Sequence, residues 1–406
     1  MSILESLKNA ETREDLAKLL GFKTSTLSYL LYKMPPELKY NSFTITKANG
    51  KERQIDAPID PLKLLQRRLA NLLYACCDEL EREHQRQPLS HGFRKKRSIV
   101  SNAQQHHNRR YVLNLDLQDF FPSINFGRVR GFFLKNKDFA LKEKVATTIA
   151  QIACHNGALP QGSPSSPILS DLVTHILDVR LAGLAKRHRV TYSRYADDLT
   201  FSTNQKHFPP EIAALSEGET PQWLLGEALI GKIENTGFAI NPAKTRMQYR
   251  DSRQTVTGLV VNQKVNIAAG YYKLARSMCH SLFLRGKYYR PVSDPPIVEG
   301  VVQPIAPMPI SPVLTDELAP LEGILSHIHH VKNQSDRRTS DAKRKDTSAA
   351  RGLYRHFLFY KTFMALRRPL ILCEGKTDNI YLRYTMLQLT AFHPTLGVID
   401  EGNLRG

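Results

Sequence analysis

Two neighbouring aspartates, Asp197 and Asp198, stand inside the segment "YSRYADDLTFST" at 192–203. The aromatic and aliphatic residues on both sides predict two strands around a turn that holds the acid pair against a sheet. Two carboxylates held together repel each other, so one takes up a proton unless a cation neutralises the pair. Mg²⁺ suits such a turn, because it prefers oxygen ligands and is often shared with substrate phosphates.

Asp116 is the predicted third carboxylate of this site. It is the acid well inside an otherwise apolar, strand-like segment, "YVLNLDL". A buried carboxylate without a partner costs several kcal/mol. If this strand packs beside the 197–198 turn, one site with two Mg²⁺ ions compensates all three acids. Two ions held in this way activate a hydroxyl and stabilise the leaving pyrophosphate of an in-line displacement, so the acids predict nucleotidyl transfer.

The charge of the chain favours a polyanionic partner. The 406 residues include 57 Lys and Arg against 38 Asp and Glu, a formal net charge of +19. Each Lys or Arg that replaces a condensed counterion on nucleic acid contributes binding free energy. A generically basic soluble protein would have the same composition, so the charge supports nucleic-acid binding without deciding it.

Composition and patterning exclude other classes of protein. Hydrophobic residues make up 41% of the chain, which argues against disorder. No run approaches the length of a membrane span, and the N-terminus "MSILESLKNAETRED" is charged where a signal peptide needs an apolar stretch. The five cysteines show no C-x-x-C pairing and are expected to be reduced thiols. We therefore expect a soluble, cytoplasmic protein with no membrane partner.

Helix and strand patterns alternate irregularly, as is typical of an α+β domain with an antiparallel sheet. An apolar strand opens the segment 109–124, and a hairpin is expected over 190–203. Eight prolines within 291–320 predict an extended insertion. Near residue 367 a new unit is expected to begin, with an apolar strand that ends at Glu374 and a helix after it. Further helices are expected over 60–80, 139–154 and 165–188.

Five segments together resemble the palm motifs of reverse transcriptases. In chain order they read "NLDLQDFFPSI", "LPQGSPSSPILS", "YADD", "GFAINPAKT" and "VTGLVV". The resemblance covers roughly residues 40–285, and five motifs in the family's order and spacing are far more specific than any one of them. It implies a right-hand polymerase fold with fingers, palm and thumb, and an RNA-directed DNA polymerase that uses deoxynucleoside triphosphates and two Mg²⁺ ions.

The resemblance also assigns roles to individual residues. Asp116 and Asp197 match the principal metal ligands, Asp198 matches the third carboxylate, and the carbonyl of Leu117 matches a further ligand. Phe121 matches the aromatic steric gate that disfavours a 2′-hydroxyl, although it could instead be a core residue like Phe120. The remaining nucleotide-binding candidates are Arg53, Arg94, Gln161, Gly162 and Lys244, of which Lys244 could equally be a solvated turn lysine.

Two shorter elements narrow the resemblance to bacterial retron reverse transcriptases. "NAQQH" resembles an N-A-x-x-H element through Asn102 and His106, and "VTG" resembles a V-T-G element through Val256, Thr257 and Gly258. In that family both are implicated in holding RNA, whereas ordinary helix and strand packing is the alternative. A retron enzyme copies its own structured non-coding RNA into multicopy single-stranded DNA, primed from an RNA 2′-hydroxyl. This implies the RNA and its branched DNA product as partners, together with a role in defence against phage.

Near the C-terminus, "LILCEGKTDNIYL" resembles the first motif of a TOPRIM domain, with Glu374 in the acid/base position. The second TOPRIM motif, a D-x-D pair that holds Mg²⁺, does not occur between 375 and 406, so the unit is expected to be incomplete. A helix start with a coincidental glutamate is the alternative.

The predicted organisation has three parts. Residues 1–265 form fingers and palm, 266–366 form a helical thumb with the proline-rich insertion, and 367–406 begin a TOPRIM-like unit. Two other functions stay open: an effector-associated or nuclease scaffold whose polymerase fold mainly binds RNA, and a group II intron-like reverse transcriptase. Association with an effector or with a second copy is also possible in the retron interpretation. The expected thumb contacts to the nucleic-acid backbone are Lys273, Arg276, Arg285 and Lys287.

Overall fold

The computed structural model describes most of the chain and divides it into two units, Met1–Lys345 and Asp346–Gly406. The described residues are 2–46, 52–84, 89–217, 221–290, 313–334, 336–366, 371–390, 392–393, 398–400 and 403–405. The division at 345/346 precedes the predicted start of the TOPRIM-like unit at 367. The predicted boundary between palm and thumb lies inside the first unit and stays a prediction.

A five-stranded antiparallel sheet lies at the centre of the first unit. Its middle strand is β3 (Tyr111–Gln118), which pairs with β5 (Asp198–Thr203) on one side. On its other side β3 pairs first with β9 (Arg246–Tyr249) and then with β8 (Ala239–Ile240). The edge strand β4 (Thr191–Tyr195) completes the sheet beyond β5. The expected strand at the start of 109–124 and the hairpin over 190–203 are thus confirmed.

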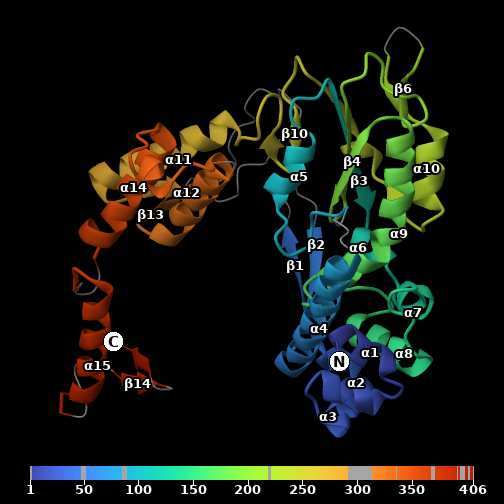
Figure 1. The fold of residues 1–406 in the computed structure, drawn as a ribbon, viewed down its shortest axis with the longest axis horizontal. Coiled ribbons are helices and arrows are strands. Elements are labelled where there is room, and N and C mark those ends of the chain that lie inside the picture. The colour runs from blue at the N-terminus through green and yellow to red at the C-terminus, as the bar shows by residue number, and fades with distance from the viewer. Residues whose placement is uncertain are drawn as a thin grey trace. The chain divides into compact units, whose positions relative to one another are not determined.

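Helix α9 (Ser166–Arg187) runs along this sheet with α10 (Glu227–Glu234) beside it (Figure 1). Thirteen residues of α9 are buried, including Asp171 and Asp178, so the helix is buried through most of its length rather than along one stripe. Pro167 in its first turn suits the helix start, where the missing N–H group leaves no bond unmade. The buried faces of α9 and β3–β5 form much of the hydrophobic core.

Helices pack on the N-terminal side of the palm, around the long helix α4 (Asp60–His84). Ser2 and Thr12 form capping boxes at the starts of α1 and α2, which satisfy their free amide groups. The segment "SFTITKANGKERQIDAPI" predicts two strands around a turn at Asn49–Gly50. The strands β1 (Tyr40–Thr46) and β2 (Glu52–Pro58) form this antiparallel pair, while the turn lies outside the described residues. The other helices that precede α9 in the chain are α1 (Ile3–Asn9), α2 (Arg13–Leu19), α3 (Thr24–Ser28), α5 (Ile99–Gln105), α6 (Phe120–Ser123), α7 (Phe126–Lys135) and α8 (Glu143–Ala153). Of these, α1 and α8 contact α4, whereas α5 packs against β4 and the β10–β11 hairpin.

Short hairpins and two longer helices complete the first unit. Strand β6 (Ala213–Leu215) pairs with β7 (Trp223–Leu225), and β10 (Thr255–Val256) pairs with β11 (Leu259–Val260). Helices α11 (Ala269–Arg285) and α12 (Leu318–Asn333) pack on each other, and α13 (Ser340–Arg344) follows. Strands β12 (Tyr288–Arg290) and β13 (Val313–Thr315) pair across the proline-rich insertion, whose residues 291–312 lie outside the described ranges.

The second unit contains α14 (Ala349–Phe359), α15 (Lys376–Leu389) and the hairpin of β14 (Val398–Asp400) and β15 (Asn403–Arg405). The expected helix after Glu374 is confirmed as α15. The strand expected before Glu374 is wrong, because residues 371–373 have no regular structure and both Ile371 and Leu372 are exposed. No helix in the described part of either unit is long and apolar enough to cross a membrane.

Candidate active site

The register of β3 and β5 brings together acids that are far apart in the sequence. Asp116 lies directly opposite Asp198 in the antiparallel ladder. The ladder continues into the turn, where the amide of Leu117 donates to the carbonyl of Asp197 at 3.0 Å. Side chains directly opposite each other in such a pair lie within about 5.5 Å at Cβ. The predicted convergence of Asp116 with the 197–198 turn is therefore present in the backbone.

The turn itself has an unusual backbone conformation. Tyr195 pairs with Asp198, which leaves Ala196 and Asp197 as a two-residue connection, and Ala196 has a φ of 55°. A positive φ is the conformation that glycine adopts most readily, so an alanine here must be held by its surroundings. Gly92 packs against it so closely that a Cβ at position 92 would lie 2.4 Å from the amide nitrogen of Ala196. Gly92 thus fits against the turn because it has no side chain.

The acids share an electrostatic environment with two cations. Partial burial, together with the neighbouring charge of Asp116, raises the pKa of Asp197, while Lys244 and Arg53 act in the opposite direction. The ammonium of Lys244 lies 2.7 Å from Oδ2 of Asp116, and the side-chain amide of Asn241 donates to Oδ1 at 3.1 Å. The Asp116 side chain is only 7% exposed. Lys244 therefore lies beside the acids and contacts a carboxylate, and its contact with a nucleotide stays a prediction.

The predicted three-carboxylate set is not preformed. Across the described ranges, no three carboxylate, imidazole or thiol groups are arranged to hold a metal ion. Asp116 and Asp197 nevertheless fit a shared Mg²⁺, since the register of β3 and β5 brings Asp116 to the acidic turn. Burial and then the charge of Asp116 raise the pKa of Asp197, and a bound cation would offset both effects. Mg²⁺ commonly takes one or two protein carboxylates and completes its shell with water and substrate phosphates. The Leu117 carbonyl stays a predicted ligand.

Several predicted nucleotide contacts lie on segments that meet near this site. The carbonyl of Gln161 accepts from the amide of Asp56 at 2.7 Å, which ties the 161–162 loop to β2. Gly162 has a φ of 120°, and a Cβ there would lie 2.8 Å from the carbonyl oxygen of Asp56. Only glycine fits this approach. Arg53 on β2 is exposed and is close enough to influence Asp197.

The two adjacent phenylalanines after β3 take different positions. Phe120 is 4% exposed and stacks on Phe238 with ring centroids 5.8 Å apart. Phe121 is only partly buried, and its ring lies 6.1 Å from that of Phe93. Phe120 is therefore the core residue, which leaves Phe121 as the candidate for the steric gate.

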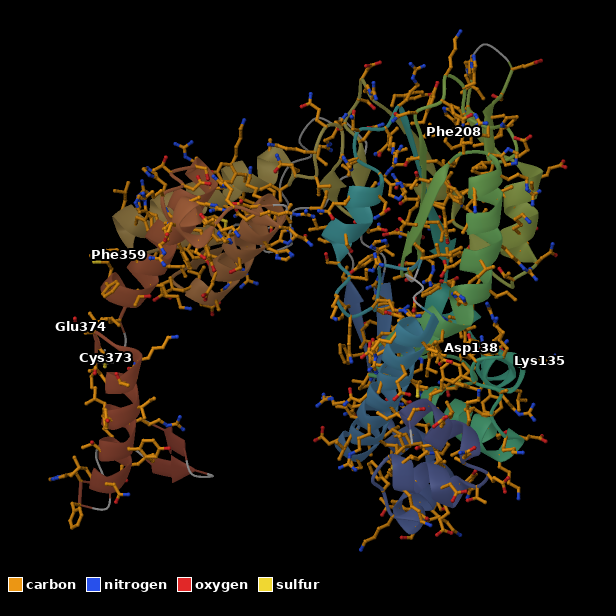
Figure 2. The ribbon with its side chains drawn as sticks, viewed as in Figure 1. Lys135, Asp138, Phe208, Phe359, Cys373 and Glu374 are labelled. Atoms are coloured by element: carbon orange, nitrogen blue, oxygen red, sulfur yellow. The ribbon has the colours of Figure 1, made fainter. Side chains whose placement is uncertain are left out.

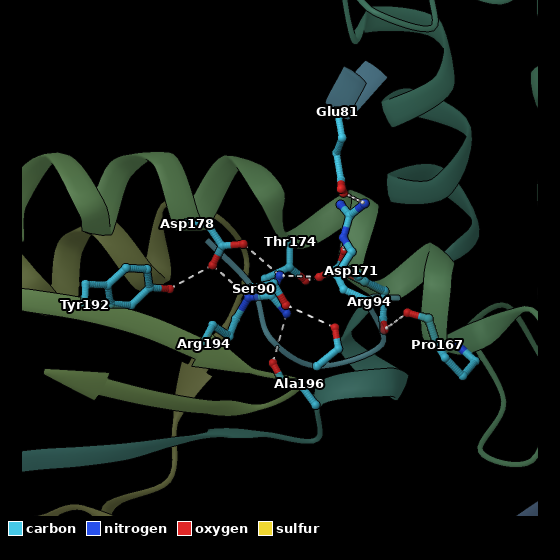
Figure 3. A network of polar contacts seen from close by, with 12 residues as sticks. Glu81, Ser90, Arg94, Pro167, Asp171, Thr174, Asp178, Tyr192, Arg194 and Ala196 are labelled. Atoms are coloured by element: carbon cyan, nitrogen blue, oxygen red, sulfur yellow. Dashed lines mark hydrogen bonds and ion pairs between the residues drawn. The ribbon is translucent and has the colours of Figure 1, made fainter. Parts of the chain in front are cut away.

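Arg94 takes part in a buried ion network rather than extending to solvent (Figure 3). Its Nε lies 2.5 Å from Oδ2 of Asp171 and its Nη1 lies 3.3 Å from Glu81 on α4. The Arg94 side chain is 12% exposed. Since two carboxylates already hold its guanidinium, the structure disfavours the predicted nucleotide contact and gives Arg94 a role in joining α4 to α9.

Arg194 is the centre of this network, and sequence reasoning overlooked it. The guanidinium is fully buried and binds both oxygens of Asp178 at 2.7 Å, with Asp171 at 2.9 Å. Its Nη1 donates to the carbonyl of Ala196, inside the acidic turn, at 3.1 Å. Burial disfavours the charged guanidinium, but Asp178 and Asp171 outweigh it and raise the pKa of Arg194. A charged residue in the middle of the predicted strand "TYSRY" was the signal that could have identified it.

The structure corrects the prediction that Asn102 and His106 contact RNA. Both side chains are fully buried. The imidazole of His106 is hydrogen-bonded to Ser202 and Ser193 at 2.7 Å each, and Ser193 donates to Asn102 at 2.6 Å. Burial is the main reason that the pKa of His106 falls to about 3, so the ring is neutral. These residues fasten α5 to β4 and β5, which was the alternative interpretation of the N-A-x-x-H element.

The V-T-G element forms the turn between β10 and β11. Thr257 and Gly258 both have positive φ, 47° and 79°, while Val256 is buried and pairs with Leu259. This two-residue connection with positive φ at both positions is typical of a type I′ hairpin turn. The hydroxyl of Thr257 donates to the carbonyl of Ile99, the first residue of α5, at 3.1 Å. The V-T-G turn is therefore hydrogen-bonded to α5, the helix that carries Asn102, and RNA binding by Thr257 and Gly258 stays a prediction.

Glu374 lies just before α15 in the second unit, next to Cys373 (Figure 2). It is exposed, and the adjacent Gly375 caps the helix by donating its amide to Asp378 at 2.9 Å. This arrangement matches the alternative interpretation of the segment as a helix start. The TOPRIM-like interpretation stays a prediction.

Comparison with known proteins agrees with this geometry. The family model "Reverse transcriptase (RNA-dependent DNA polymerase)" matches residues 45–261. Retron Mx65 reverse transcriptase of Myxococcus xanthus is 35% identical over 289 residues, which is 66% of this chain and 62% of that protein. Retron Mx162 reverse transcriptase of the same organism is 35% identical, covering 63% of this chain and 54% of that protein. Retron Ec86 reverse transcriptase of Escherichia coli is 32% identical, covering 66% and 77%.

The matched region contains β3, the acidic turn and α9, and the aligned part spans somewhat over half the length of the first two relatives. A family model that covers more than half of the chain, together with retron relatives at about one-third identity, agrees with the resemblance based on the five motifs. The chain belongs to the reverse transcriptase family, and its relatives include the retron reverse transcriptases of bacteria.

Proposed function

We propose that this protein is an RNA-directed DNA polymerase of the retron type. The observation that carries the proposal is the pairing of Asp116 with Asp198 across β3 and β5, with Asp197 bonded to the backbone of Leu117. Two divalent ions, most simply Mg²⁺, would supply the Lewis acid that activates the primer hydroxyl and stabilises the leaving pyrophosphate. Asp116 and Asp197 are the residues that would hold them.

The protein's own groups have separate tasks in this proposal. Lys244, which lies 2.7 Å from Asp116 in the free protein, would move its ammonium to the triphosphate when the carboxylate binds a metal ion. Gln161 and Gly162 would position the nucleotide, because their loop is fixed to β2 by the Asp56 hydrogen bond. Phe121 would lie beneath the sugar and select deoxynucleotides by excluding a 2′-hydroxyl.

Primer extension on an RNA template with Mg²⁺ and deoxynucleoside triphosphates tests the polymerase activity. We expect the wild-type protein to extend the primer and Asp197→Asn to lower the rate by roughly 10³-fold or more, because several kcal/mol of transition-state stabilisation is lost. Asp341→Asn removes an exposed carboxylate on α13 and should leave the rate unchanged. Equal rates for the wild type and Asp197→Asn would refute the proposal and favour an RNA-binding scaffold.

The nucleic acid that copurifies with the protein tests the retron part. We propose that the product is multicopy single-stranded DNA joined to a structured RNA through a 2′-hydroxyl. Sequencing should then show branched RNA–DNA molecules, whereas linear cDNA would favour a group II intron-like enzyme.

The resemblance further implies defence against phage, with a TOPRIM effector. This role stays a prediction. The plating efficiency of phage on cells that carry the system, compared with cells carrying its Asp197→Asn variant, checks it.

A further inference from the structure

The end of the palm sheet away from the acids carries a dense positive charge. Six exposed side chains there define what we call the distal basic surface: Arg110, Lys186, Arg187, Arg189, Lys206 and Arg250. They come from four chain segments, 109–110, 186–190, 204–207 and 250–253, which together contain one acidic residue, Asp251. Nothing in the proposed polymerase reaction uses these residues.

The strand register brings the four segments together at one end of the sheet, where the strands begin or finish. Tyr111, the first residue of β3, lies opposite Thr203 at the end of β5 and opposite Tyr249 at the end of β9. Thr191, the first residue of β4, lies opposite Ser202. Each segment therefore enters or leaves the sheet at the same end, which brings cations from distant parts of the sequence together.

Hydrogen bonds fix these segments to one another. The amide of Arg250 donates to the carbonyl of Arg110 at 3.0 Å, and the amide of Arg110 donates to the side chain of Asn204 at 2.8 Å. The side chain of Gln205 donates to the carbonyl of His188 at 2.7 Å. Because the backbone is held in this way, the cations project from an ordered surface and not from mobile loops.

The distal basic surface is separate from the catalytic acids. Asp116 is five residues beyond Tyr111 on β3, a separation of roughly 17 Å at the usual rise of a strand. A nucleotide bound at Asp116 cannot reach Arg110 or Arg250. Four of the six cations are arginines, whose planar guanidinium groups bind phosphate through two parallel hydrogen bonds.

We propose that the distal basic surface binds the phosphate backbone of a part of the template RNA that lies outside the catalytic site. This inference rests on the proposed function, which makes a structured RNA the partner. It predicts that long structured RNA uses both the catalytic site and the distal basic surface, whereas a short primer–template uses the catalytic site alone.

A charge-neutralising variant and a matched control test the proposal in the full-length chain. The variant combines Arg110→Gln, Arg187→Gln and Lys206→Gln, one change from each of three segments. The control combines Lys135→Gln, Lys137→Gln and Lys144→Gln, three exposed lysines of the α7–α8 region that remove the same charge (Lys135 is labelled in Figure 2). Fluorescence of Trp223, the only tryptophan of the chain, verifies that both proteins are folded.

The probes are a structured RNA transcript of about 150 nucleotides, a single-stranded DNA of the same length and a 12-base-pair RNA–DNA primer–template. Relative to the control, we expect the variant to bind the RNA roughly tenfold or more weakly, with a salt-dependence slope shallower by about two to three. Extension of the short primer–template should be unchanged. Equal RNA binding by variant and control would overturn the proposal, and so would an equal loss with single-stranded DNA, which would identify the surface as a general polyanion or product site.

The same measurements separate the two proposals. If the wild-type protein does not extend the primer but the variant binds the RNA more weakly than the control, the polymerase proposal is refuted and RNA binding by the distal basic surface is supported. If the wild-type protein extends the primer and the variant and the control bind the RNA equally well, only RNA binding by the distal basic surface is refuted.

Discussion

The acidic turn of the palm and the glutamate before α15 differ in what supports them. Beneath the turn lies a fully buried guanidinium, Arg194, which joins Asp171, Asp178 and the carbonyl of Ala196. Within α15, by contrast, no side chain is buried, and Tyr381 and Tyr384 are 72% and 64% exposed. The first segment lies in the matched reverse-transcriptase region and the second only resembles a TOPRIM motif, and only the first is held by a surrounding shell of buried side chains. Catalytic groups need such a shell to keep their geometry, so a motif match is stronger when the structure supplies one.

The largest expected effect is the loss of the buried guanidinium. Arg194→Met leaves Asp171 and Asp178 without one of their partners in a buried site, which should lower the free energy of unfolding of the palm by about 3–5 kcal/mol. Urea denaturation followed by Trp223 fluorescence measures this loss of stability, because Trp223 lies in the same unit, Met1–Lys345. Arg276→Met, on the exposed face of α11, is the control and should change stability by less than about 0.5 kcal/mol. If both variants change the free energy of unfolding by a similar, small amount, Arg194 does not support the acidic turn.

The next effect concerns His106, the buried imidazole between Ser193 and Ser202. His106→Ala leaves both hydroxyl groups without this partner and should cost roughly 2–3 kcal/mol in the same denaturation experiment. The neighbouring His107→Ala changes an exposed ring and should have little effect. Weaker RNA binding by His106→Ala with wild-type stability would restore the direct RNA contact that the structure argues against.

A smaller effect, an increase in the free energy of unfolding, is expected when Asp197 is replaced by Asn. Because partial burial and Asp116 raise its pKa, the folded state holds a proton that the unfolded state has already released, and stability falls as pH rises through that window. In EDTA at pH 7, Asp197→Asn should therefore raise the free energy of unfolding by up to about 1 kcal/mol, although we expect the same variant to lose most of its DNA synthesis. The gain should vanish once the pH falls below the ordinary pKa of an aspartate. A destabilised Asp197→Asn protein in EDTA would show that the turn is not electrostatically strained.

The smallest effect is expected in the second unit. Glu374 is exposed and precedes a helix without a buried side chain. Glu374→Ala should leave palm stability within about 0.5 kcal/mol of the wild type and should not change primer extension. A clear loss of DNA synthesis would show that this segment contributes to the polymerase.

The sequence by itself determined the position of the acids along the chain and the elements that carry them. An apolar strand interrupted by one acid, and an acid pair between apolar flanks, follow from local periodicity, so Asp116 and the 197–198 hairpin could be predicted. The helix after Glu374 could also be predicted, but not the missing strand before it, because an apolar run forms a strand only if a sheet is there to pair with it.

Only the tertiary structure decided which polar residues face the site and which are buried. Arg94, Asn102 and His106 look like surface contacts in a basic protein, yet partners from distant segments enclose all three. The importance of Arg194 likewise depends on Asp171 and Asp178, which come from another element and are unremarked in the sequence. Local patterns report which element a residue belongs to, whereas burial and ion pairing depend on contacts between residues far apart in the chain, and the fold alone sets those.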